Sequence, residues 1–164
     1  MGFSGVGAEP TQAMHPFAKE ESAAPSPPLP RPAMPLALKV YAACFTAFFA
    51  LDLLWLGVIA KGFYQKHLGH LMREDVQWPA ALAFYLIYLA AIVILCVLPA
   101  LEKQSLGRAI TLGAVFGLAA YAAFDLTSLA LLKGFPVPAV MVDLVWGTVL
   151  TASVSAAGYL VGRG

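Results

Sequence analysis

Four long runs of apolar residues are the feature that most constrains how this chain can fold. They cover about residues 40–60, 79–101, 109–132 and 136–161. Each run can cross a membrane, because a helix that rises 1.5 Å per residue needs about 20 residues to span roughly 30 Å of hydrocarbon. A backbone in lipid must satisfy its own hydrogen bonds, so each run is predicted to be an α-helix. The sequence therefore predicts an all-α integral membrane protein built as a bundle of four transmembrane helices.

The composition argues against the same four helices forming the core of a soluble protein. The chain is 60% hydrophobic and 12% charged, whereas a soluble domain has about 25% charged residues. Too few charged side chains remain to cover a surface that faces water, so lipid is the expected partner. The net charge of +1 offers no strongly basic surface, and we therefore expect no nucleic-acid partner.

Residues 1–37 differ in composition from the rest of the chain. Eight of the twelve prolines lie between Pro10 and Pro35, and no hydrophobic period accompanies them. We predict a disordered tail here, followed by a transmembrane domain over residues 38–162. The tail lacks the apolar segment of a secretory signal peptide. Met34 is an alternative start, so the sequence leaves open whether residues 1–33 are translated.

The polar connection 61–78 carries apolar and aromatic side chains at helical spacing. These are Phe63, Tyr64, Leu68, Leu71 and Met72. The spacing predicts a short amphipathic helix lying in the membrane interface. His67, His70 and Glu74 are residue types that bind metals, but this spacing is as common in solvated loops. We predict no metal site and no cofactor.

The distribution of basic residues gives an expected orientation. An even number of spans places both termini on one side of the membrane. That side would carry six lysines and arginines and the other side four. Because cytoplasmic segments are enriched in lysine and arginine, we expect cytoplasmic termini.

Three aspartates, Asp52, Asp125 and Asp143, lie inside the apolar runs. A charged residue at the centre of a membrane helix costs at least about 2.5–3.5 kcal/mol, so such residues usually face a partner or a cavity. Counting from the helix ends at 1.5 Å per residue places all three roughly 10–12 Å below the same membrane face. Tyr85 falls at a similar depth on the second helix. The sequence predicts one polar layer shared by four helices.

Aromatic residues accompany these carboxyl groups. Tyr121 precedes Asp125 by one helical turn, and Trp55 and Trp146 each follow an aspartate at three residues. We predict a pocket that binds a ligand through Asp52, Asp125, Asp143, Tyr85, Tyr121, Trp55 and Trp146. The alternative is that the aspartates only form hydrogen bonds between helices and hold the bundle together.

A short internal repeat is also visible. Asp52-Leu53 is followed by Lys61-Gly62-Phe63, and Asp125-Leu126 is followed by Lys133-Gly134-Phe135. The first and third helices run in the same direction, so two hairpins related by a parallel duplication would explain the pattern. The duplication remains a hypothesis, because apolar sequences resemble one another by composition.

Several motifs together resemble a family of small bacterial predicted membrane proteins that is catalogued as a domain of unknown function. The motifs are Asp52-Leu-Leu-Trp-Leu-Gly57, Leu68-Gly69-His70-Leu71, Tyr121-Ala-Ala-Phe-Asp-Leu-Thr127 and Asp143-Leu-Val-Trp-Gly-Thr148. The resemblance covers about residues 38–162 and leaves out the proline-rich tail. It implies four transmembrane helices in the bacterial inner membrane, and it implies no reaction, ligand or catalytic residue.

These observations leave three kinds of function open. The first is a pocket that binds or transports a proton, a cation or a small amphiphile, with a homo-oligomer as the expected assembly. The second is a lipid-modifying membrane enzyme, although the sequence has no nucleophile motif or cofactor fingerprint. The third is a structural subunit of a larger membrane complex. We favour the first function, and we do not expect an enzyme.

Overall fold

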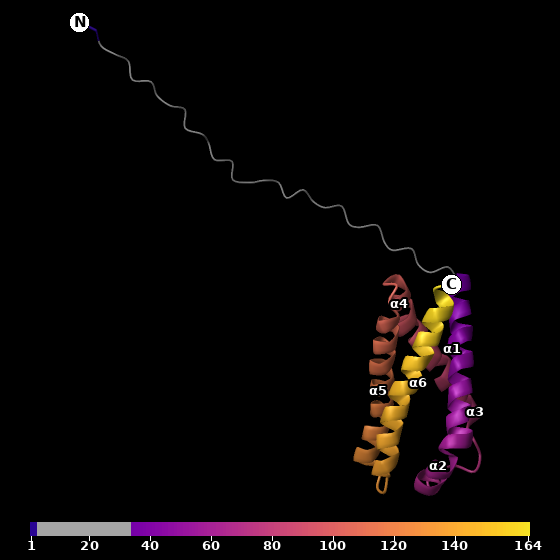
Figure 1. Cartoon of the computed structure of the whole chain (residues 1–164). Helices are drawn as coiled ribbons and strands as arrows, with labels where there is room; N and C mark the ends of the chain where they lie inside the picture. The colour runs from indigo at the N-terminus through magenta and orange to yellow at the C-terminus, as the bar shows by residue number, and fades with distance from the viewer. Residues whose placement is uncertain (3–33) are drawn as a thin grey trace. The chain divides into compact units, whose positions relative to one another are not determined.

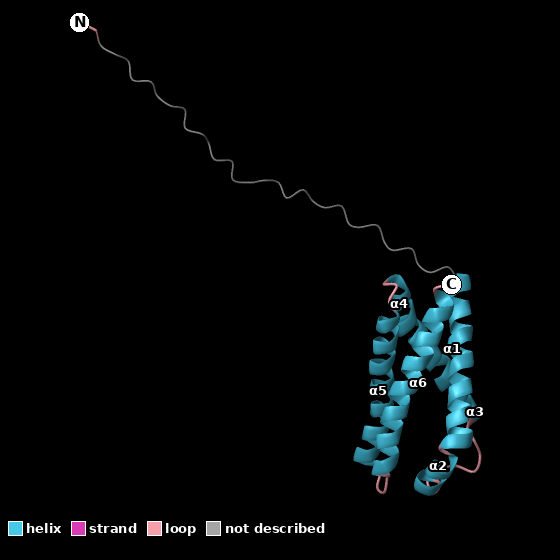
Figure 2. Ribbon diagram, viewed as in Figure 1, coloured by secondary structure: helices cyan, strands magenta, loops and turns pink. Residues whose placement is uncertain are grey.

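The computed structural model describes residues 1–2 and 34–164 of the chain. The predicted disordered tail, apart from its ends, lies outside the described residues. The regular structure of the described part is entirely helical (Figures 1 and 2). In chain order its elements are α1 (Met34–Leu54), η1 (Trp55–Ile59), α2 (Lys61–Leu68), α3 (Trp78–Ile92), η2 (Val93–Val97), α4 (Leu98–Glu102), α5 (Leu106–Leu131) and α6 (Val137–Gly162).

The prediction of an all-helical chain with four membrane spans is confirmed. The helices that are long and apolar enough to cross a membrane are Pro35–Ile59, Trp78–Glu102, Leu106–Leu131 and Val137–Gly162. The first span starts ahead of the predicted boundary, because α1 begins at Met34. Pro35 fits in the first turn of a helix, where its missing N–H would have had no partner in any case.

Helix α6 occupies the centre of the bundle. It packs against α5 on one side and against α1 on the other, as Figures 1 and 2 show. Helices α5 and α6 form an antiparallel hairpin, and Gly134 turns the chain between them with a φ of 79°. A residue with a side chain rarely adopts this conformation, so glycine suits the turn.

The close packing of α5 on α6 depends on small residues. A Cβ atom added at Gly117 would lie 2.2 Å from the carbonyl oxygen of Gly147, and one added at Gly113 would lie 2.5 Å from Ser155 Oγ. Neither distance can be sustained by real atoms. Lipid tails are as apolar as the helix surfaces, so the hydrophobic effect does not drive helices together inside the membrane. The van der Waals contacts made by this close approach between backbones therefore stabilise the hairpin.

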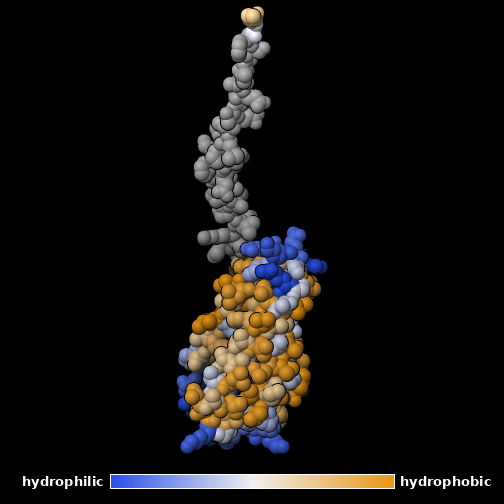
Figure 3. Space-filling model, turned by 90° about the vertical axis from the view of Figure 1, so that its left-hand side faces the viewer, coloured by the Kyte–Doolittle hydropathy of each residue, from blue (hydrophilic) through white to orange (hydrophobic). Residues whose placement is uncertain are grey.

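The outer surface of the bundle is apolar and its two ends are polar. Leu53, Ile87, Val115 and Leu131 are among the large hydrophobic side chains that are exposed on the outside. Figure 3 shows hydrophobic residues over the middle of the face in view and hydrophilic residues at both ends. This distribution suits a bundle whose sides face lipid and whose ends face water.

Two π-helical turns interrupt the first and second spans. In η1 the N–H of Ala60 donates to the carbonyl oxygen of Trp55 at 2.7 Å, a bond that spans five residues instead of four. In the second span, η2 and α4 pack against α5, whereas the backbone of α3 makes little close contact with α5. The first half of this span therefore leaves room between α3 and α5.

Candidate functional site

The three membrane aspartates lie on the central helix α6 and on its two neighbours, α1 and α5. Asp52 is on α1 and 7% exposed, and Asp125 is on α5 and 1% exposed. Asp143, on α6, is half-buried. Among the described residues, neither carboxyl oxygen of Asp125 has a hydrogen-bond partner. A buried polar group without a partner costs about 1–3 kcal/mol, and a charged one costs more.

Asp143 is held by a helix outside the membrane spans. The Tyr64 hydroxyl, on α2, donates a hydrogen bond to Asp143 Oδ1. The same hydroxyl accepts a hydrogen bond from Trp55 Nε1 at 3.3 Å. These two bonds tie η1, α2 and α6 together at the membrane face where α2 lies. Burial raises the pKa of the Tyr64 phenol above its ordinary value, and the hydrogen bond to Asp143 raises it further.

The two site tryptophans stack on each other. The rings of Trp55 and Trp146 are 4.3 Å apart and inclined by 8°. Trp146 lies beside the Asp52 carboxyl group, but its indole N–H reaches no hydrogen-bond partner within the described part of the chain. The stack joins η1 to α6.

Tyr121 links the aspartates to one another. Its ring lies against the backbone of Gly147, where an added Cβ would be 2.2 Å from the ring. Asp52, Asp143 and Tyr64 are all close enough to act on the Tyr121 phenol electrostatically. Asp125 and Asp143 are within the same range of each other. We call Asp52, Asp125, Asp143, Tyr64 and Tyr121 the carboxylate cluster. Four of these residues belong to the binding site predicted from sequence, and Tyr64 does not.

Tyr85 lies at the edge of this cluster. It is close enough to Asp52 for electrostatic interaction, yet its ring packs mainly on Phe48 and Phe49, with centroids at 5.6 and 4.9 Å. Its surroundings are therefore those of a core aromatic residue as much as those of a binding residue. Its assignment to the binding site stays a prediction.

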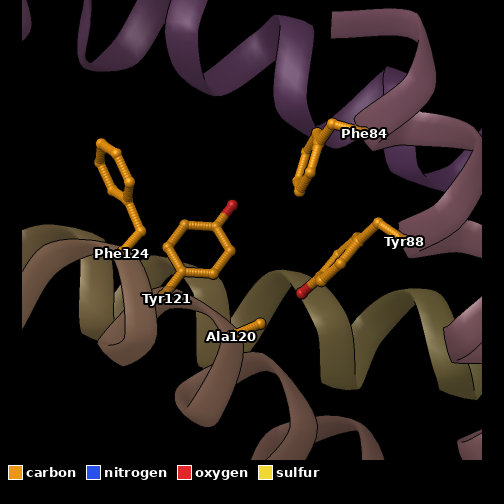
Figure 4. Close-up of a pocket in the computed structure, with 5 residues that line it drawn as sticks. All are labelled: Phe84, Tyr88, Ala120, Tyr121 and Phe124. Atoms are coloured by element: carbon orange, nitrogen blue, oxygen red, sulfur yellow. The ribbon is translucent and has the colours of Figure 1, made fainter. Parts of the chain in front are cut away.

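Two pockets flank the carboxylate cluster. One has a volume of about 400 Å³ and is lined by Phe84, Tyr88, Ala120, Tyr121 and Phe124, between α3 and α5 (Figure 4). The other has a volume of about 530 Å³ and is lined by Trp55, Trp146 and aliphatic residues of α6. No aspartate lines either of these two pockets. Of the binding residues predicted from sequence, the aspartates belong to the buried cluster, whereas Tyr121, Trp55 and Trp146 also line the pockets.

Tyr64 is the site residue that sequence reasoning missed. The sequence placed it correctly on a short helix of the 61–78 connection, but only as an apolar residue facing the interface. It lies on the half-buried face of α2 with Phe63, His67 and Leu68, while Lys61, Gln65 and Lys66 are exposed. The sequence did offer one signal for Tyr64: a tyrosine hydroxyl on the inner face of the predicted short helix can form a hydrogen bond with a buried carboxyl group nearby.

The histidines of this region show no metal-binding arrangement. His67 Nδ1 lies 2.9 Å from the carbonyl oxygen of Phe63 in its own helix, and His70 is exposed. Among the described residues, no group of three or more His, Cys, Asp or Glu side chains could hold a metal ion.

Comparison with known proteins identifies the family of the chain. No curated protein and no solved structure matches the chain. One family does, over residues 37–160, a range that covers all but the outermost residues of the first and fourth spans and includes every residue of the carboxylate cluster. Its description is that of a predicted membrane protein, which agrees with the four apolar helices. The chain belongs to this family, the predicted membrane proteins DUF2177.

Proposed function

We propose that this protein binds a small organic cation at the carboxylate cluster, inside the membrane, in exchange for a proton. The observation that carries the proposal is Asp125, which is 1% exposed and has no hydrogen-bond partner for either carboxyl oxygen among the described residues. An ionised carboxylate in such surroundings needs a positive partner, and without one the carboxyl group keeps its proton. The group is therefore suited to hold either a proton or a cation.

Within the described residues, the chain supplies no cation of its own for this purpose. Every lysine and arginine of the described residues is exposed. The basic residues within the spans, Lys39 and Arg108, belong to the opposite end of the bundle from α2. A positive charge at the level of Asp125 would thus come from a ligand.

The aromatic residues around the cluster favour an organic cation over a metal ion. Trp146 lies near Asp52 and stacks on Trp55, and Tyr121 lies within electrostatic range of Asp52 and Asp143. Aromatic faces attract quaternary and protonated amines, with a contribution of about 2 kcal/mol or more where water is excluded. A hydrated metal ion would instead require several oxygen ligands at short range. The other two functions left open by the sequence, a lipid-modifying enzyme and a structural subunit, gain no specific support.

The test measures cation binding and proton release together. The probe is tetramethylammonium chloride, titrated calorimetrically into protein in lipid nanodiscs, in two buffers with different heats of ionisation. We expect saturable binding with release of a proton from wild type and loss of both in Asp125→Asn. The exposed Asp75 provides the matched control, and Asp75→Asn should bind as wild type does.

Two results would contradict the proposal. One is the absence of saturable binding by wild-type protein. The other is binding that Asp125→Asn leaves unchanged, because the charge of Asp125 is the feature on which the proposal rests.

We further propose that the protein lies in a bacterial inner membrane with both termini in the cytoplasm. The described residues divide their lysines and arginines evenly, with Lys39, Lys103, Arg108 and Arg163 at one end and Lys61, Lys66, Arg73 and Lys133 at the other. The excess that supports cytoplasmic termini comes from Lys19 and Arg31 in the preceding segment. We also propose membrane lipid and a second copy of the chain as partners, since four helices form a small unit for transport.

A further inference from the structure

The pocket between α3 and α5 has walls that are held in place. Tyr88 stacks on Phe84 with centroids at 5.2 Å and on Phe116 at 5.4 Å. The Tyr88 hydroxyl also shares a hydrogen bond of 2.7 Å with Thr151 Oγ1 on α6. These contacts fix the α3 side of the pocket to the centre of the bundle. A pre-formed pocket of about 400 Å³ is within the size range of small-molecule sites.

The pocket has one polar group that points inward. Figure 4 shows the Tyr121 hydroxyl directed into the space between Phe84 and Phe124. Asp52 and Asp143 lie within electrostatic range of this phenol. The pocket is therefore apolar and aromatic over most of its wall, and its Tyr121 side faces the carboxylate cluster.

This combination selects for a particular kind of ligand. Aromatic faces bind flat rings by stacking and bind cations through their π-electrons. Asp52 and Asp143, which act electrostatically on the Tyr121 phenol, attract a positive charge, and every lysine and arginine of the described chain is exposed. A molecule that carries a ring and an ammonium group would place the ring among Phe84, Tyr88 and Phe124 and its charge towards the cluster.

We propose that the α3–α5 pocket is a binding site for the ring of an aromatic ammonium ion whose charged group is bound by the carboxylate cluster. The proposal rests on the proposed function for the charged group and adds the site and chemistry of the apolar part. The pocket lies between two membrane spans, Trp78–Glu102 and Leu106–Leu131, so the ligand is an amphiphile that partitions into the bilayer.

The experiment compares two cations that differ by a ring. Benzyltrimethylammonium and tetramethylammonium are titrated into the full chain in nanodiscs. We expect the benzyl compound to bind wild type at least about tenfold more tightly, because its ring fills the aromatic pocket. Partition into lipid also favours the benzyl compound, so the decisive comparison is between protein variants in the same lipid.

Two neighbouring alanines provide that comparison. Ala120 lines the pocket, whereas Ala119 is exposed on the outside of α5. In Ala120→Leu the added side chain fills the pocket. The affinity ratio of the benzyl compound to tetramethylammonium should then fall to about the value that lipid partition alone gives. Tetramethylammonium itself should still bind. Ala119→Leu should bind both compounds as wild type does. Phe84→Ala removes one wall of the pocket without filling the space, and it should also lower the affinity ratio of the benzyl compound to tetramethylammonium.

The outcomes separate the two proposals. If neither compound binds wild type, both proposals fail. If tetramethylammonium binds but the benzyl advantage is the same in Ala120→Leu and Ala119→Leu, the pocket proposal alone is wrong. If filling the pocket weakens the benzyl compound while Asp125→Asn binds both compounds as wild type does, the proposed function is wrong and the pocket still holds the ring.

Discussion

Tyr64 is the residue through which the helix at the membrane face reaches the buried aspartates. Its phenol donates to Asp143 and accepts from Trp55 Nε1, so one hydroxyl satisfies two groups from two spans. The hydrogen bond to Asp143 requires the protonated phenol. Because burial and this bond both raise the pKa of Tyr64, the phenol keeps its proton at pH values where a free tyrosine begins to lose it.

Tyr64→Phe should therefore lower the stability of the folded protein, and the loss should depend on pH. At neutral pH we expect a loss of about 0.5–1.5 kcal/mol, the usual contribution of one hydrogen bond. Because the pKa of Tyr64 is higher in the folded state, the phenol loses its proton first in the unfolded state as the pH rises. The stabilisation from the Tyr64 hydroxyl is therefore complete below about pH 10 and declines at higher pH. Unfolding of the two proteins in detergent, measured between pH 8 and pH 11, checks both statements.

Tyr41 provides the control for this substitution. It is also half-buried, but it lies on α1 away from the aspartates, and its hydroxyl contacts only the carbonyl oxygen of Leu86 at 3.5 Å. Tyr41→Phe should change stability little. An equal effect of the two substitutions at every pH would show that the bond between Tyr64 and Asp143 has no special contribution.

At the scale of elements, the α5–α6 hairpin is the part of the fold most sensitive to side-chain size. Gly117→Ala would place a methyl group against the backbone of α6, 2.2 Å from the carbonyl oxygen of Gly147. Because a backbone atom cannot move aside, the helices must separate, and we expect a loss of about 1–3 kcal/mol or more. The measurement is thermal unfolding in detergent, followed by circular dichroism.

Gly107 shows what the same change does without a close neighbour. It lies in the first turn of α5, and an added Cβ would be 3.9 Å from the nearest atom, Ser105 Oγ. Gly107→Ala should be neutral or slightly stabilising, because alanine favours the helix. If both alanine variants proved equally stable, close packing of α5 on α6 would not be what holds the hairpin.

The π-helical turn η1 explains a difference within the internal repeat. Lys61 follows Asp52 by nine residues, from 52 to 61, whereas Lys133 follows Asp125 by eight, from 125 to 133. The additional residue lies in the segment where the Ala60 N–H bonds to Trp55 across five residues. One inserted residue is what turns an α-helical turn into a π-helical one. This finding supports the duplication hypothesis without testing it.

Deleting Gly57 should convert η1 into an ordinary helical turn and leave α2 close to its present position. A π-helical turn holds one residue more than an α-helical turn, so removal of the extra residue restores the α-helical turn without rotating the helix that follows. The bond between Tyr64 and Asp143 should therefore persist, and the effects of the Gly57 deletion and of Tyr64→Phe should be additive. A double-mutant cycle of unfolding free energies measures this.

Deletion of Glu74 from the exposed connection between α2 and α3 is the matched control. There the cost of Tyr64→Phe should be the same as in the full-length chain. Strongly non-additive effects of the Gly57 deletion and Tyr64→Phe would mean that the deletion moves α2 and that η1 is more than a locally absorbed extra residue.

For the whole molecule, the four spans require α2 and the connection after it to lie on the opposite side of the membrane from the termini of the bundle. Glu74 and Glu102 are exposed glutamates at these two ends. In a background with Cys44→Ala and Cys96→Ala, we expect a membrane-impermeant maleimide to label Glu74→Cys in intact cells. Glu102→Cys should be labelled only after the membrane is opened.

Neither substitution alters the count of lysine and arginine, so the orientation itself is undisturbed. The reverse labelling pattern would show that the termini face outward, against the proposed orientation. Labelling of both positions in intact cells would contradict an arrangement with four spans.

The four spans and their lengths could be predicted from the sequence, because hydropathy and helix rise are local properties. The shared depth of Asp52, Asp125 and Asp143 stays a prediction, and the structure places them on α1, α5 and α6. What local properties leave undetermined is how each helix is rotated about its axis and how far apart two helices lie. Those depend on the contacts made with every neighbour at once.

The tertiary structure alone decided which groups have partners. It gave Asp143 a phenol from α2, left Asp125 buried without a hydrogen bond among the described residues, and opened a pocket between α3 and α5. Tyr64 and Asp143 are 79 residues apart in the sequence. The helix that carries Tyr64 follows a π-helical turn, which hydropathy does not reveal. The sequence thus determined that carboxyl groups lie within the apolar helices, and packing determined which of them have hydrogen-bond partners.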